Sequence, residues 1–462
     1  MANPSIEKAV AHAHAQRDEY MTHYHELLRI PSISTDPAHK EDINRCAAWL
    51  VDELKRIGFN NCQAIPSDGH PVVYGEWLEA GDDKPTVLVY AHYDVQPVDP
   101  IDLWDSPPFE PTVRDGKLYA RGSIDDKAGV WVNLKAFESM FAVDGKLPVN
   151  IKILFEGEEE TGSPNMLPFV QQHKDLLKAD LLQISDGGSL PDQPLIIYGA
   201  RGIVDAEVTV TGPVRDLHSG VYGGIVQNPV HVAGDIIASF HDASGRIQID
   251  GFYDRVKPPS AAELKALEES LKIFLPDWEA ESGVKTWWGE AMGTLGERAT
   301  MLPTLDVNGI WGGYQGPGVK TIIPGQVKFK VTMRLVADQD PNEIKALFTA
   351  HVMRFASDTA QVEVHASPGS WPVTMLFDSP EVEAIHRAFE ATWGKRALMV
   401  RTGGSIPIMG MFQRELNMPI TSLGFGVGEN LHSPNEFLWI EHFYRNIDTA
   451  IHFYYNLGEI TK

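Results

Sequence analysis

Hydrophobic positions along the first part of the chain fall into two patterns, a helical spacing of three and four residues and short strand-sized runs. The expected elements, in chain order, are helices over residues 5–29 and 43–57, strands over 71–77 and 86–91, a helix over 127–141, a strand over 149–155, a helical segment over 165–177 and a strand over 180–184. Strands that alternate with helices predict an α/β layer structure with a largely parallel central sheet.

The pattern changes near Ile203 and changes back after Pro372. Between them, the expected elements are strands over 205–211, 327–335 and 361–365 and helices over 228–241, 261–274 and 340–355. Alternating strands with few helices predict an α+β sandwich. A helix over 380–393, a strand over 420–425 and a helix over 440–457 then resume the α/β pattern. We therefore expect one domain from residues 1–206 and 373–462, and a smaller domain, 207–372, inserted into it, since 462 residues exceed the usual size of a single core.

Composition and charge narrow the classes of function. Lys and Arg total 39 and Asp and Glu total 63, which gives a net charge of −24. A field of that sign repels nucleic-acid phosphates and anionic membranes, and it suits a protein that collects divalent cations. The apolar runs are strand-sized, far short of the ~20 residues of a membrane span. Residues 1–20 lack a secretory core, and Cys46 and Cys62 form no disulfide framework, so we expect a soluble, cytoplasmic protein.

Acidic and histidine-bearing segments follow four of the expected strands of the first domain, and a fifth lies near the end of the chain. They are residues 90–97 (YAHYDVQP), 120–129 (ARGSIDDKAG), 155–163 (FEGEEETGS), 182–188 (LQISDGG) and 426–434 (GVGENLHSP). Each has an ordinary structural interpretation: a capped histidine, a helix N-terminus, a solvated acidic loop, a turn aspartate or a surface histidine. Together they also supply the two histidines and three carboxylates that a pair of borderline cations would bind, and both interpretations stay open at this point.

Two spacings suggest how such a site would be divided. His92 and Asp94 are two residues apart, so in an extended segment they point to the same side, as a ligand histidine and the acid that fixes its tautomer would. Glu159 and Glu160 are adjacent, so in an extended segment they diverge. One of them could then bind metal while the other handles protons.

The motifs in these segments occur in the order of a known family. They are His92-x-Asp94-x-Gln96-Pro97, Gly122-Ser123-x-Asp125-Asp126-Lys127, Glu159-Glu160-x-Gly162-Ser163, Leu217-His218-Ser219-Gly220 and Leu431-His432-Ser433. The chain resembles the dinuclear-zinc dipeptidases of the carnosinase and cytosolic non-specific dipeptidase type, over nearly its whole length. These belong to the larger metallopeptidase family of carboxypeptidase G, aminoacylase and succinyl-diaminopimelate desuccinylase.

The resemblance implies a catalytic α/β domain with helices on both faces of its sheet and an inserted lid and dimerisation domain. It implies two divalent metal ions per subunit, zinc or manganese, with one ligand set of His92, Asp125 and Asp186 and a second of Asp125, Glu160 and His432. Glu159 would be the general base and Asp94 the acid that orients His92. Asp126 would shape the turn that carries Asp125. The substrate-binding residues implied are His218, as oxyanion donor, and Thr321, Arg334 and Ser405.

The resemblance further implies a hydrolase, a protease of the metallopeptidase class that cleaves dipeptides with a free C-terminal carboxylate and acts as a homodimer. One alternative is an N-acyl amino acid deacylase, which would use the same metals and base. Another is a catalytically silent relative that binds metal or peptide without hydrolysis. A missing ligand or base would favour the silent relative, and the motifs lack neither.

Overall fold

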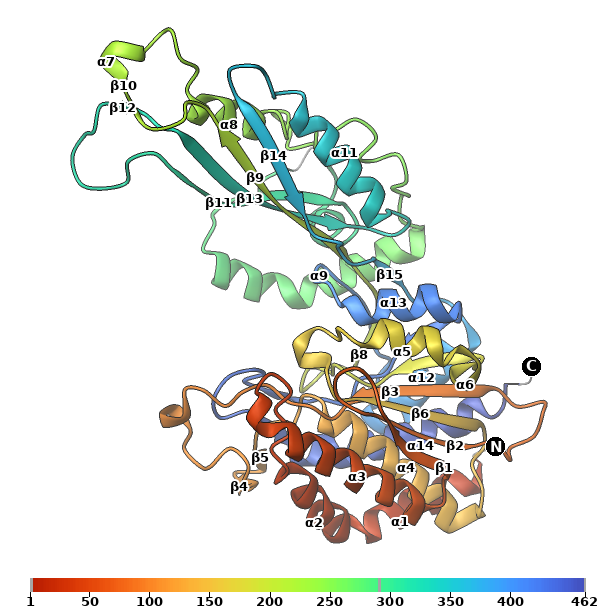
Figure 1. Cartoon of the computed structure of the whole chain (residues 1–462). Coiled ribbons are helices and arrows are strands. Elements are labelled where there is room, and N and C mark those ends of the chain that lie inside the picture. The colour runs from red at the N-terminus through yellow and green to blue at the C-terminus, as the bar shows by residue number, and fades with distance from the viewer. Residues whose placement is uncertain (1–2, 290–291, 461–462) are drawn as a thin grey trace. The chain divides into compact units, whose positions relative to one another are not determined.

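The protein divides into two compact units in a computed structural model that describes residues 3–289 and 292–460 (Figure 1). The first unit is Met1–Tyr198, Met375–Val400 and Phe412–Lys462, and the second is Gly199–Thr374 and Arg401–Met411. The second unit thus begins earlier than residue 207 and includes a short segment from the last part of the chain. Hydrogen bonding within this unit explains that inclusion, because the Arg201 amide donates to the Gly404 carbonyl at 3.0 Å.

A six-stranded sheet, in the order β1-β2-β6-β3-β7-β17, forms the centre of the first unit. Its strands are β1 (Asn60–Ile65), β2 (Val72–Trp77), β3 (Thr86–His92), β6 (Asn150–Glu156), β7 (Leu181–Ile184) and β17 (Ile420–Ser422). The four strands from β6 to β17 are parallel, and β1 and β2 are antiparallel to their neighbours. The α/β class with a largely parallel sheet is confirmed, and the two antiparallel strands make the sheet mixed.

Helices cover both faces of this sheet; Figure 1 shows α4 and α14 on one side and α5 and α6 on the other. The helices assigned wholly or partly to this unit are α1 (Pro4–Ala15), α2 (Arg17–Leu28), α3 (Lys40–Ile57), α4 (Lys127–Asp144), α5 (Met166–Gln172), α6 (Lys174–Leu177), α12 (Pro380–Trp393), α13 (Pro407–Leu416) and α14 (Ile440–Leu457). The single helix expected over residues 5–29 is wrong: the chain breaks at Gln16 into α1 and α2. β3 and β6 are almost fully buried, as strands covered on both faces are.

A second, smaller sheet of the first unit has the order β18-β19-β5-β4. Its strands are β4 (Thr112–Arg114), β5 (Lys117–Tyr119), β18 (Gly428–Glu429) and β19 (Phe437–Trp439). Strands β5 and β19 are antiparallel, with Tyr119 opposite Phe437. This pairing brings the segment after residue 119 close to the segment before residue 437. A separate sheet, β15-β8-β16, consists of β8 (Leu195–Ala200), β15 (Val373–Thr374) and β16 (Leu398–Thr402), of which β15 belongs to the second unit.

The second unit is built on an antiparallel sheet in the order β11-β13-β9-β14. Its strands and helices are β9 (Gly202–Thr211), β10 (Leu217–His218), α7 (Ser219–Tyr222), α8 (Pro229–Ala238), α9 (Ala261–Ser282), α10 (Leu295–Thr300), β11 (Thr304–Gly312), β12 (Ile322–Ile323), β13 (Gln326–Leu335), α11 (Pro341–Met353) and β14 (Gln361–Ala366). Alternate residues of β9 and β13 join α8 and α11 in one hydrophobic core. Helix α9 extends past the expected residue 274 and continues through Pro276.

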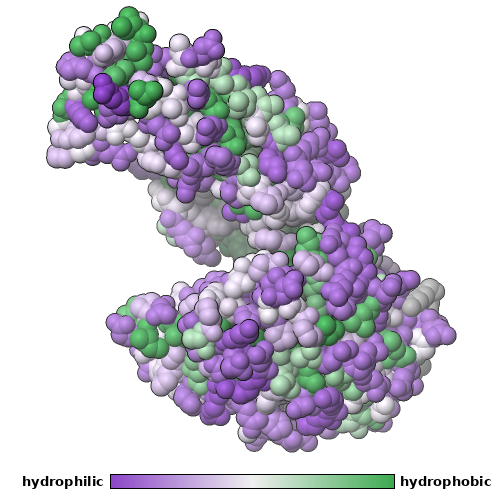
Figure 2. Space-filling model, in the orientation of Figure 1, coloured by the Kyte–Doolittle hydropathy of each residue, from purple (hydrophilic) through white to green (hydrophobic). Residues whose placement is uncertain are grey.

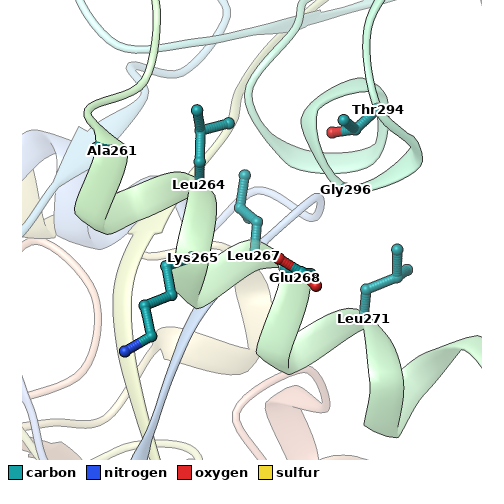
Figure 3. Close-up of a pocket in the computed structure, with 8 residues that line it drawn as sticks. All are labelled: Ala261, Leu264, Lys265, Leu267, Glu268, Leu271, Thr294 and Gly296. Atoms are coloured by element: carbon teal, nitrogen blue, oxygen red, sulfur yellow. The ribbon is translucent and has the colours of Figure 1, made fainter.

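A cavity of about 520 Å³ lies beside α9 and α10 (Figure 3). Leu264, Leu267 and Leu271 recur at helical spacing and line it from one face of α9. Lys265 and Glu268 are its charged lining residues, and none of the expected site residues is among those that line it. Over the described residues, no helix is both long enough and apolar enough to cross a membrane.

Candidate metal centre

Asp125 lies between β5 and α4, and its two carboxylate oxygens face two different histidines. Its Oδ1 is 3.1 Å from Nε2 of His92, and its Oδ2 is 3.0 Å from Nε2 of His432. His92 is almost fully buried and His432 is more than half exposed. The Asp125 carboxylate therefore lies between a buried histidine and an exposed one.

The expected metal ligands form two groups that share Asp125. Ligand atoms of His92, Asp125 and Asp186 lie within 4.8 Å of one another, and so do those of Asp125, Glu160 and His432. Each group offers one imidazole nitrogen and two carboxylate oxygens, a donor set that suits zinc or manganese. The structure thus brings together all five residues named from the sequence, in the same two sets.

Strand order explains why three of these residues meet. His92 ends β3, Glu160 follows β6 by four residues, and Asp186 follows β7 by two. β6, β3 and β7 are parallel neighbours, so their carboxyl ends lie at one edge of the sheet. Asp125 and His432 come from the loops that the β5–β19 pairing brings together.

Crowded carboxylates give the centre more negative charge than its own side chains neutralise. Burial and the charge of Asp125 raise the pKa of Glu160 to about 8, and burial also raises the pKa of Asp186. Burial opposes ionisation of Asp125 too, but hydrogen bonds from His432 and His92 lower its pKa. The same hydrogen bond from His432 to Asp125 raises the pKa of His432. Divalent cations would remove this repulsion, so the electrostatics fit a metal centre.

Asp94 is fully buried and connects His92 to the Glu159–Glu160 backbone. Nδ1 of His92 is 3.1 Å from the Asp94 carbonyl oxygen and 3.4 Å from its Oδ1. The amides of Glu159 and Glu160 donate to Oδ1 and Oδ2 of Asp94 at 3.3 and 3.1 Å. One carboxylate therefore orients a ligand histidine and fixes the turn that carries two acids.

Glu159 and Glu160 lie in a 3₁₀ turn, Glu159–Thr161, rather than in the extended segment expected. Adjacent side chains in a 3₁₀ helix still diverge, by about 120°. Burial and the charges of Asp186, Asp94 and Asp125 raise the pKa of Glu159 to about 7, against a lowering effect of His92. Glu159 belongs to neither ligand group. A carboxyl of this pKa beside the centre suits proton transfer near neutral pH.

Two further residues orient the ligands. Nε2 of Gln96 donates to Oε2 of Glu160 at 2.7 Å. Gln96 belongs to the motif His92-x-Asp94-x-Gln96-Pro97, and that position is the only signal for this role in the sequence. Asp126, which is fully buried, accepts a hydrogen bond from the His92 amide at 3.3 Å, so it shapes the centre without joining either ligand group.

The four substrate-binding residues expected from the sequence lie in the second unit, in two pairs. β10 pairs with β12, which places His218 opposite Ile322, next to Thr321. Nδ1 of His218 accepts a hydrogen bond from the Gly220 amide at 3.0 Å, so the neutral ring carries its proton on Nε2. In the other pair, Nη1 of Arg334 donates to Oγ of Ser405 at 2.8 Å, and both residues are half-buried.

Comparison with known proteins identifies relatives along almost the whole chain. Residues 88–456 match the profile of peptidase family M20/M25/M40. A Cys-Gly metallodipeptidase of Candida albicans is 31% identical, with 95% of each chain aligned. The human Beta-Ala-His dipeptidase is also 31% identical, over 93% of this chain and 88% of its own length. These matches confirm the resemblance drawn from the motifs.

Solved structures agree with the sequence matches. An M20 family metallo-carboxypeptidase from Sulfolobus solfataricus superposes with a TM-score of 0.79 at 31% identity, covering 96% of this chain and 100% of that one. Human carnosine dipeptidase 1 gives a TM-score of 0.72 at 30% identity, with 98% and 99% covered. The fold is therefore that of this group of peptidases, including the second unit.

Proposed function

Because the chain belongs to peptidase family M20/M25/M40, we propose that it is a metal-dependent dipeptidase whose substrates carry a free C-terminal carboxylate. The observation that carries this proposal is the pair of ligand groups sharing Asp125, with Glu159 beside them and outside both. His92, Asp125 and Asp186 would hold one divalent cation, and Asp125, Glu160 and His432 a second. Zinc or manganese suits this donor set. When bound, the two cations lower the pKa of water and polarise a carbonyl group.

Glu159 carries the proton in this mechanism. Its carboxylate accepts a proton from the attacking water and delivers it to the leaving amine, which requires a pKa near the working pH. Burial of Glu159 near other acidic side chains raises its pKa to about 7, which meets this requirement. Asp94 supports the same step by holding the Glu159 amide and by fixing the orientation of His92.

The second unit supplies the substrate contacts in this proposal. His218, with its proton on Nε2, donates to the oxyanion that develops on the scissile carbonyl. Arg334 presents a planar fork to the C-terminal carboxylate, with Ser405 fixing one arm of the guanidinium. Thr321, next to the His218 strand pair, adds a hydroxyl for the substrate backbone.

A substrate panel tests the reaction. The metal-reconstituted protein should release free amino acids from dipeptides, and the metal-free protein should not. N-acetyl and N-succinyl amino acids serve as the comparison, because a deacylase would use the same centre. Hydrolysis confined to the acylated compounds would refute the dipeptidase and establish the deacylase. The named dipeptidases among the relatives favour the first outcome.

We also propose a homodimer formed through the second unit. Large apolar side chains are exposed around α7, and Figure 2 shows hydrophobic residues gathered on the end of the second unit that carries α7. They include Val214, Val221, Ile225 and Val319. A monomeric protein rarely exposes such a patch, and His218 lies beside it. Sedimentation should give a dimer, and Ile225→Glu should give a monomer; a fully active wild-type monomer would refute this part of the proposal.

We place this enzyme in the cytoplasm. Both cysteines are free thiols in the structure, Cys46 buried and Cys62 partly exposed, which suits a reducing compartment. Its partners in this proposal are small peptides and a second copy of the chain, with neither nucleic acid nor membrane, because the charge of −24 repels both.

A further inference from the structure

Glu436 is a buried acid outside both ligand groups, and it contacts the loop that carries Asp125. Its Oε2 accepts hydrogen bonds from Nη1 of Arg121 at 2.8 Å and from the Gly122 amide at 2.9 Å. Its Oε1 accepts from the amides of Ile124 and Asp125 at 2.9 and 3.3 Å. Both oxygens of one carboxylate are thus used to bind a single turn of backbone.

The backbone of this turn needs such an acceptor. Residues 120–125 form neither helix nor strand. Backbone carbonyls accept hydrogen bonds from three of their six amides, and the Glu436 carboxylate accepts from the other three, those of Gly122, Ile124 and Asp125. Gly122 has a φ of +80°, a left-handed conformation that lets neighbouring amides converge on one point. A buried amide without a partner is strongly unfavourable, so removal of the Glu436 carboxylate would force the turn to rearrange.

The segment that carries Glu436 also carries His432. Glu436 follows His432 by four residues and directly precedes β19. Its own carbonyl accepts the Ala120 amide at 3.2 Å, next to the Tyr119–Phe437 pair. Backbone and side chain of Glu436 therefore connect the His432 loop to the Asp125 loop.

Arg121 extends this connection to the third ligand-bearing loop. Its Nη2 donates to the Pro97 carbonyl at 2.9 Å, at the end of the segment that holds His92 and Gln96. The Arg121 side chain is 1% exposed and that of Glu436 is fully buried, so solvent does not screen their ion pair. Three loops with ligands from distant parts of the chain thus meet at one buried ion pair.

We propose that Glu436 is a positioning residue that sets the separation of Asp125 and His432 and thereby the affinity of the protein for its metal ions. Because Asp125 belongs to both ligand groups, displacement of its turn affects both of them. The inference rests on the metal-binding part of the proposed function and is independent of the substrate.

Zinc competition on the full-length protein tests this proposal. The zinc-loaded wild type and Glu436→Gln are each titrated with a chelator of known zinc affinity, and the unfolding temperature of each metal-free protein is measured alongside. Glutamine keeps the size of the side chain, but its NH₂ group cannot accept from the amides that face it. We expect zinc to bind Glu436→Gln 10- to 100-fold more weakly, the range found when partners of metal ligands are removed.

Glu53→Gln is the matched control. Glu53 is also a buried acid with an arginine partner, since Nε of Arg56 donates to it at 2.7 Å, but its contacts lie on α3 and α4. This variant should unfold at a lower temperature and keep its zinc affinity within twofold. A Glu436→Gln protein that binds zinc as tightly as wild type, or a Glu53→Gln protein that loses as much affinity, would overturn the proposal.

A second variant covers the case in which Glu436→Gln does not fold. Glu436→Asp keeps both acceptor oxygens and the charge but withdraws them by one methylene. It should bind zinc at least threefold more weakly than wild type, and unchanged affinity would overturn the proposal. If the wild type binds zinc and cleaves no dipeptide, the proposed function fails, while these zinc measurements still decide the role of Glu436.

Discussion

Replacement of Glu159 by glutamine separates proton transfer from metal binding. The substitution keeps the shape of the side chain and removes its ability to accept a proton. Glu159 belongs to neither ligand group, and its amide, which binds Asp94, is unchanged. The variant should therefore keep two zinc ions and the wild-type KM.

The size of the effect follows from the role of a general base. Loss of a positioned base lowers kcat by about 10²- to 10⁴-fold, which corresponds to about 3–5 kcal/mol in the activation free energy. The same substitution lowers kcat but should stabilise the metal-free protein at high pH. Burial and neighbouring acids raise the pKa of Glu159 from 4.5 to about 7, so its contribution to folding is lost as pH rises through that range. At pH 8 the metal-free variant should be more stable than wild type, by at most about 3 kcal/mol.

Three measurements check this prediction: steady-state hydrolysis of a dipeptide, zinc stoichiometry, and urea unfolding of the metal-free proteins at pH 5 and pH 8. The wild-type kcat should rise with pH as the Glu159 carboxyl loses its proton. The midpoint of this rise should lie at or below about pH 7, because bound cations favour the ionised carboxylate. The kcat of the variant should not show this rise with pH. A variant with more than a tenth of the wild-type kcat would refute the assignment of the base, and a variant that has lost a metal would show that Glu159 is a ligand.

Three other predictions concern the metal centre, the binding of the substrate carboxylate by Arg334, and Glu156, the buried acid that ends β6. Asp125→Ala should lose both zinc ions by metal analysis, whereas Asp126→Asn should keep both, because only Asp125 belongs to the ligand groups. Arg334→Lys should raise KM for dipeptides about 10- to 100-fold with little change in kcat, because lysine cannot offer a planar fork; an unchanged KM would remove Arg334 from the substrate site. Burial raises the pKa of Glu156 to about 8, so metal-free wild type should lose stability between about pH 4.5 and 8, and Glu156→Gln should lose less in urea unfolding.

The parts of the fold predicted from the sequence are those in which local pattern and tertiary environment agree. β3 and β6 are continuous apolar runs because helices cover both of their faces, so their positions could be read within one or two residues. The ends of these strands position the acids that follow them. The motif segments could therefore be read from the sequence as parts of one candidate site. Helix α3 ends where expected because Gly58 takes the left-handed conformation that closes it.

Other features depend on contacts that periodicity does not encode. The antiparallel direction of β1 and β2 is a property of the sheet and not of their sequences. Strands β5 and β19 have three residues each, too few to show a period, yet their pairing brings His432 to Asp125. The 3₁₀ turn at Glu159 is held by hydrogen bonds to Asp94, a residue 65 positions away along the chain.

Hydrogen bonding gives the two adjacent glutamates different freedom, and that difference matches their proposed roles. The Glu160 carboxylate is held by Gln96 and lies 3.4 Å from Nε2 of His432. In the part of the chain that the structure describes, no side chain donates a hydrogen bond to the carboxylate of Glu159, although its amide is fixed. A ligand gains from immobility, since each ordered donor lowers the entropy lost on metal binding. A group that takes a proton from water and delivers it to an amine must reach two positions, so it gains from a fixed backbone and a mobile carboxylate.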